Sequence, residues 1–344
     1  MKSGKEVTIY DVAQALNISA ATVSRGLKNN PAIRHETRQK IAETAQRMGY
    51  RQNIFASNLR RKQTFTIGVV VPRLNSYFMS AVISGMEKVA NAEGYQLIIS
   101  QSQESLHKEA ANVQTMFNTR VDGLLVSLSA ETEDLQHFEL LRKKKIPLIF
   151  FDRVAEISGS SSIVIDNVKA AYEATHQLLH QGCRRILHLG GNPKSAVYAN
   201  RLQGYRKALE EASLTFEPSL VLSTDLSDQA GREAAEFVLA LPQPPDGIFA
   251  ANDTSAVACM SELKRAGWRI PEDIAVVGFN DDPVSRVVDP QLSTVSYPGQ
   301  EMGEQAAGLL IQKLRNPDEP LAEKTKLPHQ LIVRTSSQKS ITHP

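Results

Sequence analysis

From Thr66 onward the sequence alternates short, continuous apolar runs with longer amphipathic segments, and no other feature limits the possible folds as strongly. Buried strands separated by helices predict parallel sheets with helices on both faces. Periodicity alone leaves open whether the strands form one barrel or two doubly wound subdomains. The apolar runs occupy residues 67–71, 97–99, 123–128, 146–151 and 163–165, and then 186–189, 220–222, 247–250 and 275–279. Amphipathic segments such as 167–181, 201–212, 228–241 and 253–266 lie between them.

The composition is that of a globular protein with a substantial core. A length of 344 residues suggests about two domains. A hydrophobic content of 42% excludes a mainly disordered chain. No stretch approaches the roughly 18 consecutive apolar residues that a membrane helix needs. The polar start of the sequence has no apolar signal core, so we expect a cytoplasmic, nucleoid-associated protein with Cys183 and Cys259 reduced.

The net charge of +2 conceals an uneven distribution along the chain. The first 63 residues carry 12 Lys and Arg against 4 Asp and Glu, a charge of +8, which leaves −6 for the rest. A basic segment joined to a mildly acidic body indicates nucleic acid binding at one end and a different task at the other.

The basic segment carries signals for three short helices. The Thr8–Asp11 segment has the spacing of a capping box, and Ser19 can cap a second helix over 20–27. A third helix is predicted over about 35–48, with Gly49 closing it. Spacing alone does not separate a helix-turn-helix from a plain three-helix bundle, but the charge and the Ser/Thr cluster of the second helix favour DNA binding.

The motifs at 8–13 and 19–25, followed by 37–38 and 48–50, closely resemble the headpiece of the LacI/GalR (lactose-repressor) family of bacterial transcription regulators. The resemblance implies that Ala20, Ala21 and Arg25 face base edges. It places a second set near phosphates: Thr8, Tyr10, Ser19, Thr22, Ser24 and Asn29. Arg34 stands where the family usually has a capping Ser, which weakens the cap of the third helix and adds a phosphate contact.

Residues 51–64 read by themselves as a charged linker. The family carries a hinge helix here, and Asn53, Ala56 and Leu59 match its pattern, whereas Ser57 replaces an Arg. The resemblance implies that Leu59 wedges into the minor groove and kinks the duplex. A helix this short is marginal alone, so we expect it to fold only with DNA and a second subunit.

Sequence signatures of catalysis and cofactor binding are missing. No Gly-x-Gly-x-x-Gly, P-loop, His-Glu-x-x-His, Cys-x-x-Cys or Gly-x-Ser-x-Gly motif occurs. His176 and His180 are four residues apart, but without a third ligand they indicate a polar helix face rather than a metal site. We therefore expect no enzyme activity, cofactor or metal.

Polar residues recur at the predicted strand ends, where ligands bind in open α/β sheets. Asn, Asp, Ser and Arg follow the apolar runs, a mixture that suits a hydroxylated ligand. The family resemblance extends over this body to about residue 336, through motifs such as 251–253, 276–279 and 292–295. It implies the fold of periplasmic sugar-binding proteins and a set of effector-binding residues: Tyr77, Phe78, Ser127, Arg201, Asn252 and Asn280.

The resemblance also sets the domain organisation. It implies a helix-turn-helix domain over 1–50, a hinge over 51–64 and a core over 65–344, with crossovers near 165, 297 and 327. The N-subdomain then spans about 65–165 and 298–326, and the C-subdomain about 166–297 and 327–344. The fold class is thus an all-α helix-turn-helix headpiece plus an α/β core of two doubly wound parallel-sheet subdomains.

These observations predict a homodimeric, effector-responsive DNA-binding regulator that reads a near-palindromic operator. We expect a repressor of sugar or sugar-acid utilisation. Many relatives carry Asp where this chain has Asn280, which makes an anionic ligand more tolerable. A regulator of another metabolite class, such as nucleobases or general carbon control, acting with a corepressor, is the alternative. A dehydrogenase or aldolase, or a plain sugar-binding protein, fits the sequence less well.

Overall fold

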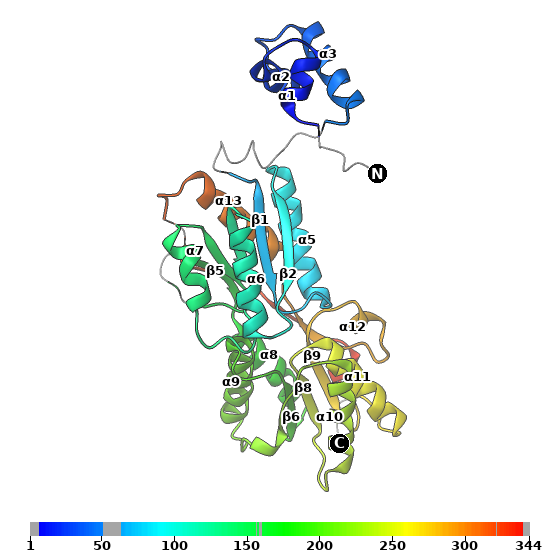
Figure 1. Ribbon diagram of the computed structural model, residues 1–344. Coiled ribbons are helices and arrows are strands. Elements are labelled where there is room, and N and C mark those ends of the chain that lie inside the picture. Colours follow the sequence, from blue (N-terminus) through cyan, green and yellow to red (C-terminus); the bar gives the residue numbers. More distant parts are fainter. Residues whose placement is uncertain (1–6, 51–62, 156, 158–159, 321, 340–344) are drawn as a thin grey trace. The chain divides into compact units, whose positions relative to one another are not determined.

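The computed structural model describes residues 7–50, 63–155, 157, 160–320 and 322–339 (Figure 1). The chain divides into two compact units, residues 1–64 and 65–344, which are treated separately below. The first is the headpiece and the second is the core. No helix in the described residues is long and apolar enough to cross a membrane.

The headpiece is a three-helix domain whose helices begin at the predicted caps. Thr8 and Asp11 form the capping box, and Asp11 accepts a hydrogen bond from the Thr8 backbone N–H at 2.7 Å. Ser19 Oγ accepts from the Thr22 backbone N–H at 3.1 Å, whereas Arg34 provides no side-chain cap. Gly49 has the predicted left-handed conformation (φ 70°). The helices are α1 (Ile9–Ala15), α2 (Ala20–Leu27) and α3 (His35–Arg47).

The core of the headpiece is small because each helix contributes only one narrow apolar face. Val12, Val23 and Ile41 are fully buried at its centre. Gly26 brings α2 close to α3, since a Cβ there would lie 2.4 Å from the end of the Ile41 side chain. The remaining surface of α2 is therefore free for polar contacts.

The first half of the core is built on a parallel sheet with strand order β11-β5-β4-β3-β1-β2. Helices α5 and α13 cover one face, and α6 and α7 cover the other (Figure 1). The strands are β1 (Thr66–Val71), β2 (Gln96–Gln101), β3 (Gly123–Val126), β4 (Leu148–Phe151), β5 (Ser161–Ile165) and β11 (Lys324–Leu327). The helices are α5 (Tyr77–Ala92), α6 (Leu106–Asn118), α7 (Glu139–Lys143) and α13 (Gly299–Arg315). We call this half the N-subdomain.

The second half, the C-subdomain, has the strand order β12-β10-β9-β8-β6-β7, and only β12 is antiparallel to its neighbour. Helices α8 and α9 cover one face, and α10 and α11 the other. The strands are β6 (Ile186–Gly190), β7 (Val221–Ser223), β8 (Gly247–Ala250), β9 (Ala275–Asn280), β10 (Ser293–Ser296) and β12 (Gln330–Ile332). The helices are α8 (Asn167–His180), α9 (Ala196–Glu211), α10 (Asp228–Ala240), α11 (Asp253–Arg265) and α12 (Val284–Val287).

This architecture confirms the predicted fold class of a helical headpiece with two doubly wound parallel-sheet subdomains. The chain passes between the two sheets three times: from β5 to α8, from β10 to α13 and from β11 to β12. Two apolar runs differ from the prediction of a buried strand, because they form the edge strands β2 and β7. In β2, Ile98 and Ile99 are 37% and 40% exposed.

Helices α5 and α13 pack with their backbones in close approach. A Cβ on Gly303 would lie 1.9 Å from the Val82 carbonyl oxygen, and a Cβ on Gly85 would lie 2.0 Å from that of Gln300. Only glycine permits this approach without moving a backbone. Gly308, on the same helix α13, meets nothing within 4 Å.

A buried carboxylate ties the end of β9 to β10 and α11. Asp253 accepts hydrogen bonds from the Asp282 backbone N–H at 2.8 Å and from Thr294 Oγ1 at 2.7 Å. Gly278 leaves room for it, since a Cβ there would lie 2.3 Å from Asp253 Oδ1. Burial raises the pKa of Asp253 to about 7, and burial also raises the pKa of Asp282 to about 6.

We expect Gly303→Ala to destabilise the core by about 1–3 kcal/mol, because overpacking at a backbone contact forces the two helices apart. Gly308→Ala is the matched control, and we expect it to leave stability unchanged or raise it by up to about 1 kcal/mol. Urea unfolding of both variants measures the difference. Equal midpoints for the two variants would contradict the close approach.

The shifted pKa of Asp253 predicts a specific pH dependence. Between its ordinary value of 3.8 and about 7, folded Asp253 holds a proton that the unfolded chain releases. This contribution to the free energy of unfolding therefore decreases as pH rises through that window. We expect Asp253→Asn to flatten the decrease, measured by urea unfolding between pH 4.5 and 7.5. Asp289→Asn, at a side chain that is 99% exposed, should keep the parent slope, and parallel curves for parent and Asp253→Asn would contradict the assignment.

Candidate DNA interface and effector cleft

The predicted base-reading residues lie on the outer surface of α2. Ala21 and Arg25 are exposed, Ala20 is half-buried, and Arg25 Nε donates to the Ala21 carbonyl at 3.4 Å. The guanidinium therefore lies along the helix, with its terminal nitrogens free of described hydrogen bonds within the headpiece. An Arg in this position can donate two hydrogen bonds to a guanine edge.

Most residues predicted near phosphates lie at the starts of α1 and α2, whereas Asn29 follows the end of α2 and Arg34 precedes α3. Thr22 and Ser24 are half-buried, while Tyr10 is 73% exposed. The backbone N–H groups of a helix N-terminus attract anions, so this end of α2 suits a phosphate. The remaining residues of this set are exposed: Thr8, Ser19, Asn29 and Arg34. The hinge predictions Asn53, Ala56 and Leu59 lie outside the described residues.

In the core, the carboxyl ends of the parallel strands of both sheets border an effector cleft, and Arg201 is its most constrained residue. The Arg201 side chain comes from α9 and is only 3% exposed. Its Nε donates to Asn167 Oδ1 at 2.9 Å and its Nη1 to the Ala251 carbonyl at 2.7 Å. The guanidinium lies 3.5 Å from the centroid of the Phe279 ring. None of these described hydrogen bonds reaches a carboxylate.

Tyr198 lies between two arginines that come from different subdomains. Its hydroxyl accepts from Arg153 Nη2 at 3.1 Å, and the guanidinium carbons of Arg153 and Arg201 lie 5.2 and 5.7 Å from its ring centroid. Arg153 follows β4 and also pairs with Glu104 at 2.6 Å. Gly191 makes room for the ring, because a Cβ there would lie 2.5 Å from it. Tyr198 thus joins the two subdomains across the cleft.

Two further ion pairs cross between the subdomains. Lys194, just before α9, pairs with Glu133 at 2.6 Å. Arg73, after β1, lies 4.0 Å from the Asp225 carboxylate. Both pairs are largely exposed, so each contributes little on its own.

An aromatic cluster brings three of the predicted effector residues together. Phe78 packs on Tyr297 with ring centroids 4.5 Å apart, and Tyr297 contacts Phe279 at 5.6 Å. The Arg201 guanidinium lies over the Phe279 ring, and the Tyr297 hydroxyl donates to Asn280 Oδ1 at 3.3 Å. Phe78, Arg201 and Asn280 are therefore linked through these two rings.

The other three predicted effector residues have different surroundings. Asn252 caps α11 by accepting from the Ser255 N–H at 3.0 Å, and it donates to the Leu226 carbonyl at 2.9 Å. Ser127 is fully buried, and its hydroxyl has no partner among the described residues. Tyr77 is 58% exposed at the start of α5. Asn252 thus has the structural role of a helix cap, while Ser127 has an unused hydrogen-bonding group.

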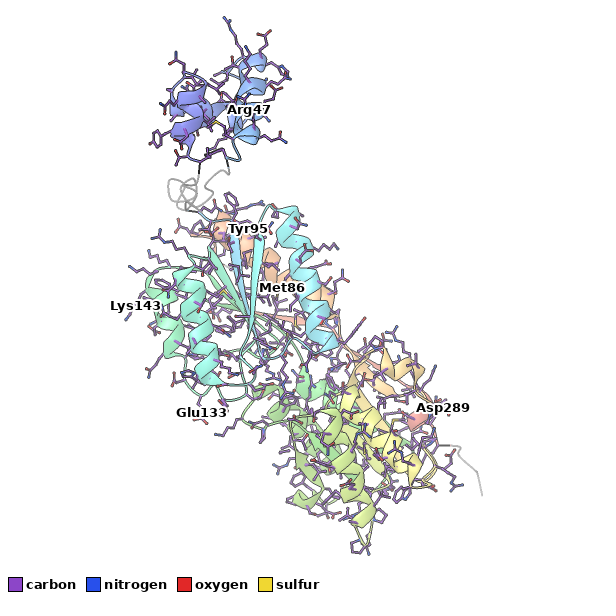
Figure 2. The ribbon with its side chains drawn as sticks, turned by 45° about the vertical axis from the view of Figure 1, so that its right-hand side comes forward. Arg47, Met86, Tyr95, Glu133, Lys143 and Asp289 are labelled. Carbon is purple, nitrogen blue, oxygen red and sulfur yellow. The ribbon has the colours of Figure 1, made fainter. Side chains whose placement is uncertain are left out.

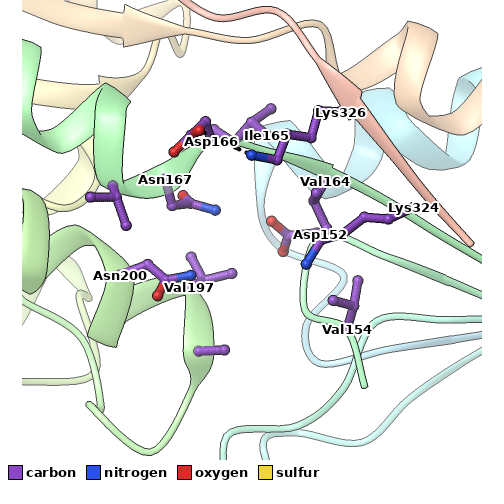
Figure 3. A pocket seen from close by; sticks show the side chains of 12 residues that line it. Asp152, Val154, Val164, Ile165, Asp166, Asn167, Val197, Asn200, Lys324 and Lys326 are labelled. Atoms are coloured by element: carbon purple, nitrogen blue, oxygen red, sulfur yellow. Dashed lines mark hydrogen bonds and ion pairs between the residues drawn. The ribbon is translucent and has the colours of Figure 1, made fainter. Parts of the chain in front are cut away.

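A cavity of about 460 Å³ opens at the first crossover, where β5 leads into α8 (Figure 3). Asn167 and Asn200 line one wall, and Asp152 and Lys324 line the other. Burial raises the pKa of Asp152, although Arg153 and Arg201 oppose the shift. None of the six predicted effector residues lines this cavity, but Asn167 connects it to Arg201.

Sequence reasoning missed several residues that build this region. Asp152 and Arg153 stand among the polar residues at predicted strand ends, but they were not included in the predicted effector set. Asn167, Tyr198 and Tyr297 carry no comparable signal, because helix and crossover positions do not reveal which cleft they face. Among the described residues, no group of three His, Cys, Asp or Glu could hold a metal ion.

Comparison with known proteins agrees with both units. Residues 8–53 match the family of bacterial regulatory proteins of the lacI type, and residues 175–337 match a periplasmic binding protein-like domain. Catabolite control protein A of Priestia megaterium is 32% identical over 333 residues, covering 96% of this chain and 99% of that protein. The repressor CytR of Escherichia coli K12 is 30% identical over 318 residues, covering 92% and 93%.

A solved structure, the transcriptional regulator CelR in complex with cellobiose, superposes with a TM-score of 0.72 at 27% identity and covers 96% of this chain and all of that one. Regulators of this type bind operator DNA and a small-molecule effector and are not enzymes. The headpiece, the two-sheet core and the full-length similarity together show that this chain belongs to the LacI family of helix-turn-helix transcription regulators.

Proposed function

We propose that this regulator is a repressor of sugar or sugar-acid utilisation whose effector binds between the two subdomains and carries an anionic group. The observation that carries the proposal is the buried Arg201, whose described hydrogen bonds go only to neutral acceptors. Guanidinium groups bind carboxylates and phosphates with paired hydrogen bonds. The nearby Asp152 carboxylate acts on Arg201 through its charge but forms no described hydrogen bond with it, so a ligand anion would supply the charge-assisted hydrogen bonds that Arg201 lacks.

The surroundings of Arg201 support a hydroxylated ligand. Asn167, Asn200 and Asp152 offer amide and carboxylate groups for hydroxyls, and a volume of about 460 Å³ lies in the range for small-molecule sites. Asn280, where many relatives have Asp, removes one negative charge from the cleft. The similarity to a cellobiose-bound regulator supports the sugar class.

A second candidate is a corepressor-dependent regulator of another metabolite class. The rings of Phe78, Tyr198 and Tyr297 could stack on a nucleobase as well as on a sugar face. The similarity to a catabolite control protein favours general carbon control within this alternative. The ligand screen described below separates these classes.

For DNA, we propose the two kinds of contact that the headpiece motifs imply, one to base edges and one to phosphates. Ala20, Ala21 and Arg25 read base edges in the major groove, and the residues around the helix starts hold phosphates. Leu59, with Asn53 and Ala56, belongs to a hinge helix that opens the minor groove. The hinge lies between 51 and 64, so it connects the reading unit to the start of β1.

We further propose that the regulator acts as a homodimer on a near-palindromic operator. The exposed edge strand β2 supports this proposal, because Ile98 and Ile99 leave apolar surface uncovered on a strand that pairs only with β1 among the described strands. Two headpieces held by one dimer would bind two half-sites. Effector binding would then change the relative placement of the subdomains and bias hinge folding.

This coupling is reciprocal by thermodynamic necessity. If the effector changes operator affinity by some factor, the operator changes effector affinity by the same factor. Operator titrations with and without the effector test this half of the proposal. Identical affinities in the two titrations would refute effector control by that ligand.

We expect Arg25→Ala to reduce discrimination between operator variants by about 1–3 kcal/mol per half-site, because the paired hydrogen bonds to one base are lost. The measurement is binding to an operator selected in vitro with the parent protein and to its single-base variants. Lys40→Ala, at an exposed position of α3, is the control and should keep the parent preference. Unchanged base preference in Arg25→Ala would show that this residue does not read sequence.

We expect a thermal-shift screen of glucose, cellobiose, gluconate, glucuronate, cytidine and adenine to identify a sugar acid, since ligand binding to the folded state raises its apparent stability. At 100 times Kd the stabilisation is about 2.7 kcal/mol. Arg201→Lys should lose most of the shift, and Arg206→Lys on the same helix should keep it. A shift with cytidine or adenine alone would favour the second candidate, and equal shifts in both variants would remove Arg201 from the site.

A further inference from the structure

Three consecutive lysines form an exposed basic segment at the end of α7 and in the turn that leads to β4, which we call the basic loop. Lys143, Lys144 and Lys145 are all exposed, and none forms an ion pair with another residue of the described chain. Figure 2 shows Lys143 at the outer margin of the N-subdomain. The preceding Arg142 differs, because it pairs with Glu139 at 3.0 Å. The basic loop is thus a local concentration of unpaired positive charge on a body whose net charge is −6.

The basic loop precedes β4, at the end of the sheet where the strands begin and where the chain enters the core at β1. The Asp122 N–H donates to the Thr66 carbonyl at 2.8 Å, and the Leu124 N–H to the Pro147 carbonyl at 2.9 Å. The starts of β1, β3 and β4 are therefore side by side. Neighbouring strands are about 4.8 Å apart, so the start of β4 lies about 10 Å from the start of β1.

Two turns that lead to this end of the sheet contain a residue whose backbone conformation favours glycine, yet both residues are cations. Two residues after helices α5, α8 and α11 stand Gly94, Gly182 and Gly267, each with positive φ, and Ser213 (φ 57°) takes this position after α9. At the corresponding positions after α6 and α7 stand Arg120 (φ 60°) and Lys145 (φ 56°). A side chain in this region is strained, whereas glycine is not. All three lysines stand at the C-terminal end of α7, where the helix dipole favours a cation, but α7 has only five residues and its dipole is correspondingly small.

We propose that the basic loop is a second, sequence-independent DNA contact, which binds backbone phosphates of the duplex that the headpiece reads. Lysine ammonium groups bind phosphates as point charges without reading bases. The segment 51–64 spans at most about 50 Å when fully extended, so DNA held by the headpiece stays within reach. Such tethering makes even weak phosphate contacts effective. This contact requires only DNA binding, so it does not depend on the effector class proposed above.

The test uses the full chain and a 40-base-pair duplex of arbitrary sequence, with the salt dependence of affinity as the readout. Each phosphate neutralised contributes about 0.9 to the slope of log K against log salt concentration. Replacing all three lysines by Gln should lower the slope by about 0.9 to 2.7. The matched control replaces Lys169, Lys207 and Lys264 of the C-subdomain by Gln, which removes the same net charge. We expect this control to keep the parent slope.

Equal slopes in the parent and the basic-loop variant would overturn the proposal, and so would an equal loss in both triple variants, since net charge would then suffice. Lys145→Gly provides a second test, because it removes the charge and relieves the backbone. We expect weaker DNA binding together with an equal or higher melting temperature. Unchanged DNA affinity with a higher melting temperature would also contradict the proposal. Loss of base preference in Arg25→Ala is a separate outcome, because this duplex carries no operator.

Discussion

The buried guanidinium of Arg201 is the interaction on which the cleft depends. An ion taken out of water costs several kcal/mol unless its surroundings compensate. Here Asn167, Ala251 and the Phe279 ring provide that compensation. Asn167 begins α8 directly after the first crossover, and Ala251 follows β8. One side chain therefore fixes the ends of three elements at the boundary of the two subdomains.

The contacts of Arg201 also lead from one subdomain to the other. Arg201 lies near Tyr198, and Tyr198 binds Arg153 from the opposite subdomain. An anion at Arg201 would compete for the space and charge that now position the Tyr198 ring. The position of α9 is thus coupled to the end of β4 through two contacts, Arg201–Tyr198 and Tyr198–Arg153. This is a physical route from a bound molecule to the placement of the subdomains.

The sequence predicted the elements better than it predicted the cleft. Local rules sufficed for the headpiece, because Thr8, Ser19 and Gly49 act within a few residues of themselves. The apolar runs likewise predicted β1 to β9, but β2 and β7 lie at sheet edges, which periodicity cannot reveal. Strands β10, β11 and β12 had no apolar run to predict them. Tyr198 and Tyr297 could not be found in this way. Their role depends on which side chains from distant segments meet, and only the folded chain brings those segments together.

The free energies of the contacts between the two subdomains are small, as expected for a switch rather than for a rigid connection. The ion pairs Lys194–Glu133 and Arg73–Asp225 are exposed, and exposed pairs contribute about 0–1 kcal/mol each. The hydrogen bond and ring contacts of Tyr198 add on the order of 1–3 kcal/mol. Allosteric couplings typically amount to about 1–3 kcal/mol as well. The Phe78–Tyr297 ring contact also joins the subdomains and adds about 0.5–1.5 kcal/mol. Each of these contacts is thus of the same order as a typical allosteric coupling, so a ligand that prefers one arrangement can change the balance among them.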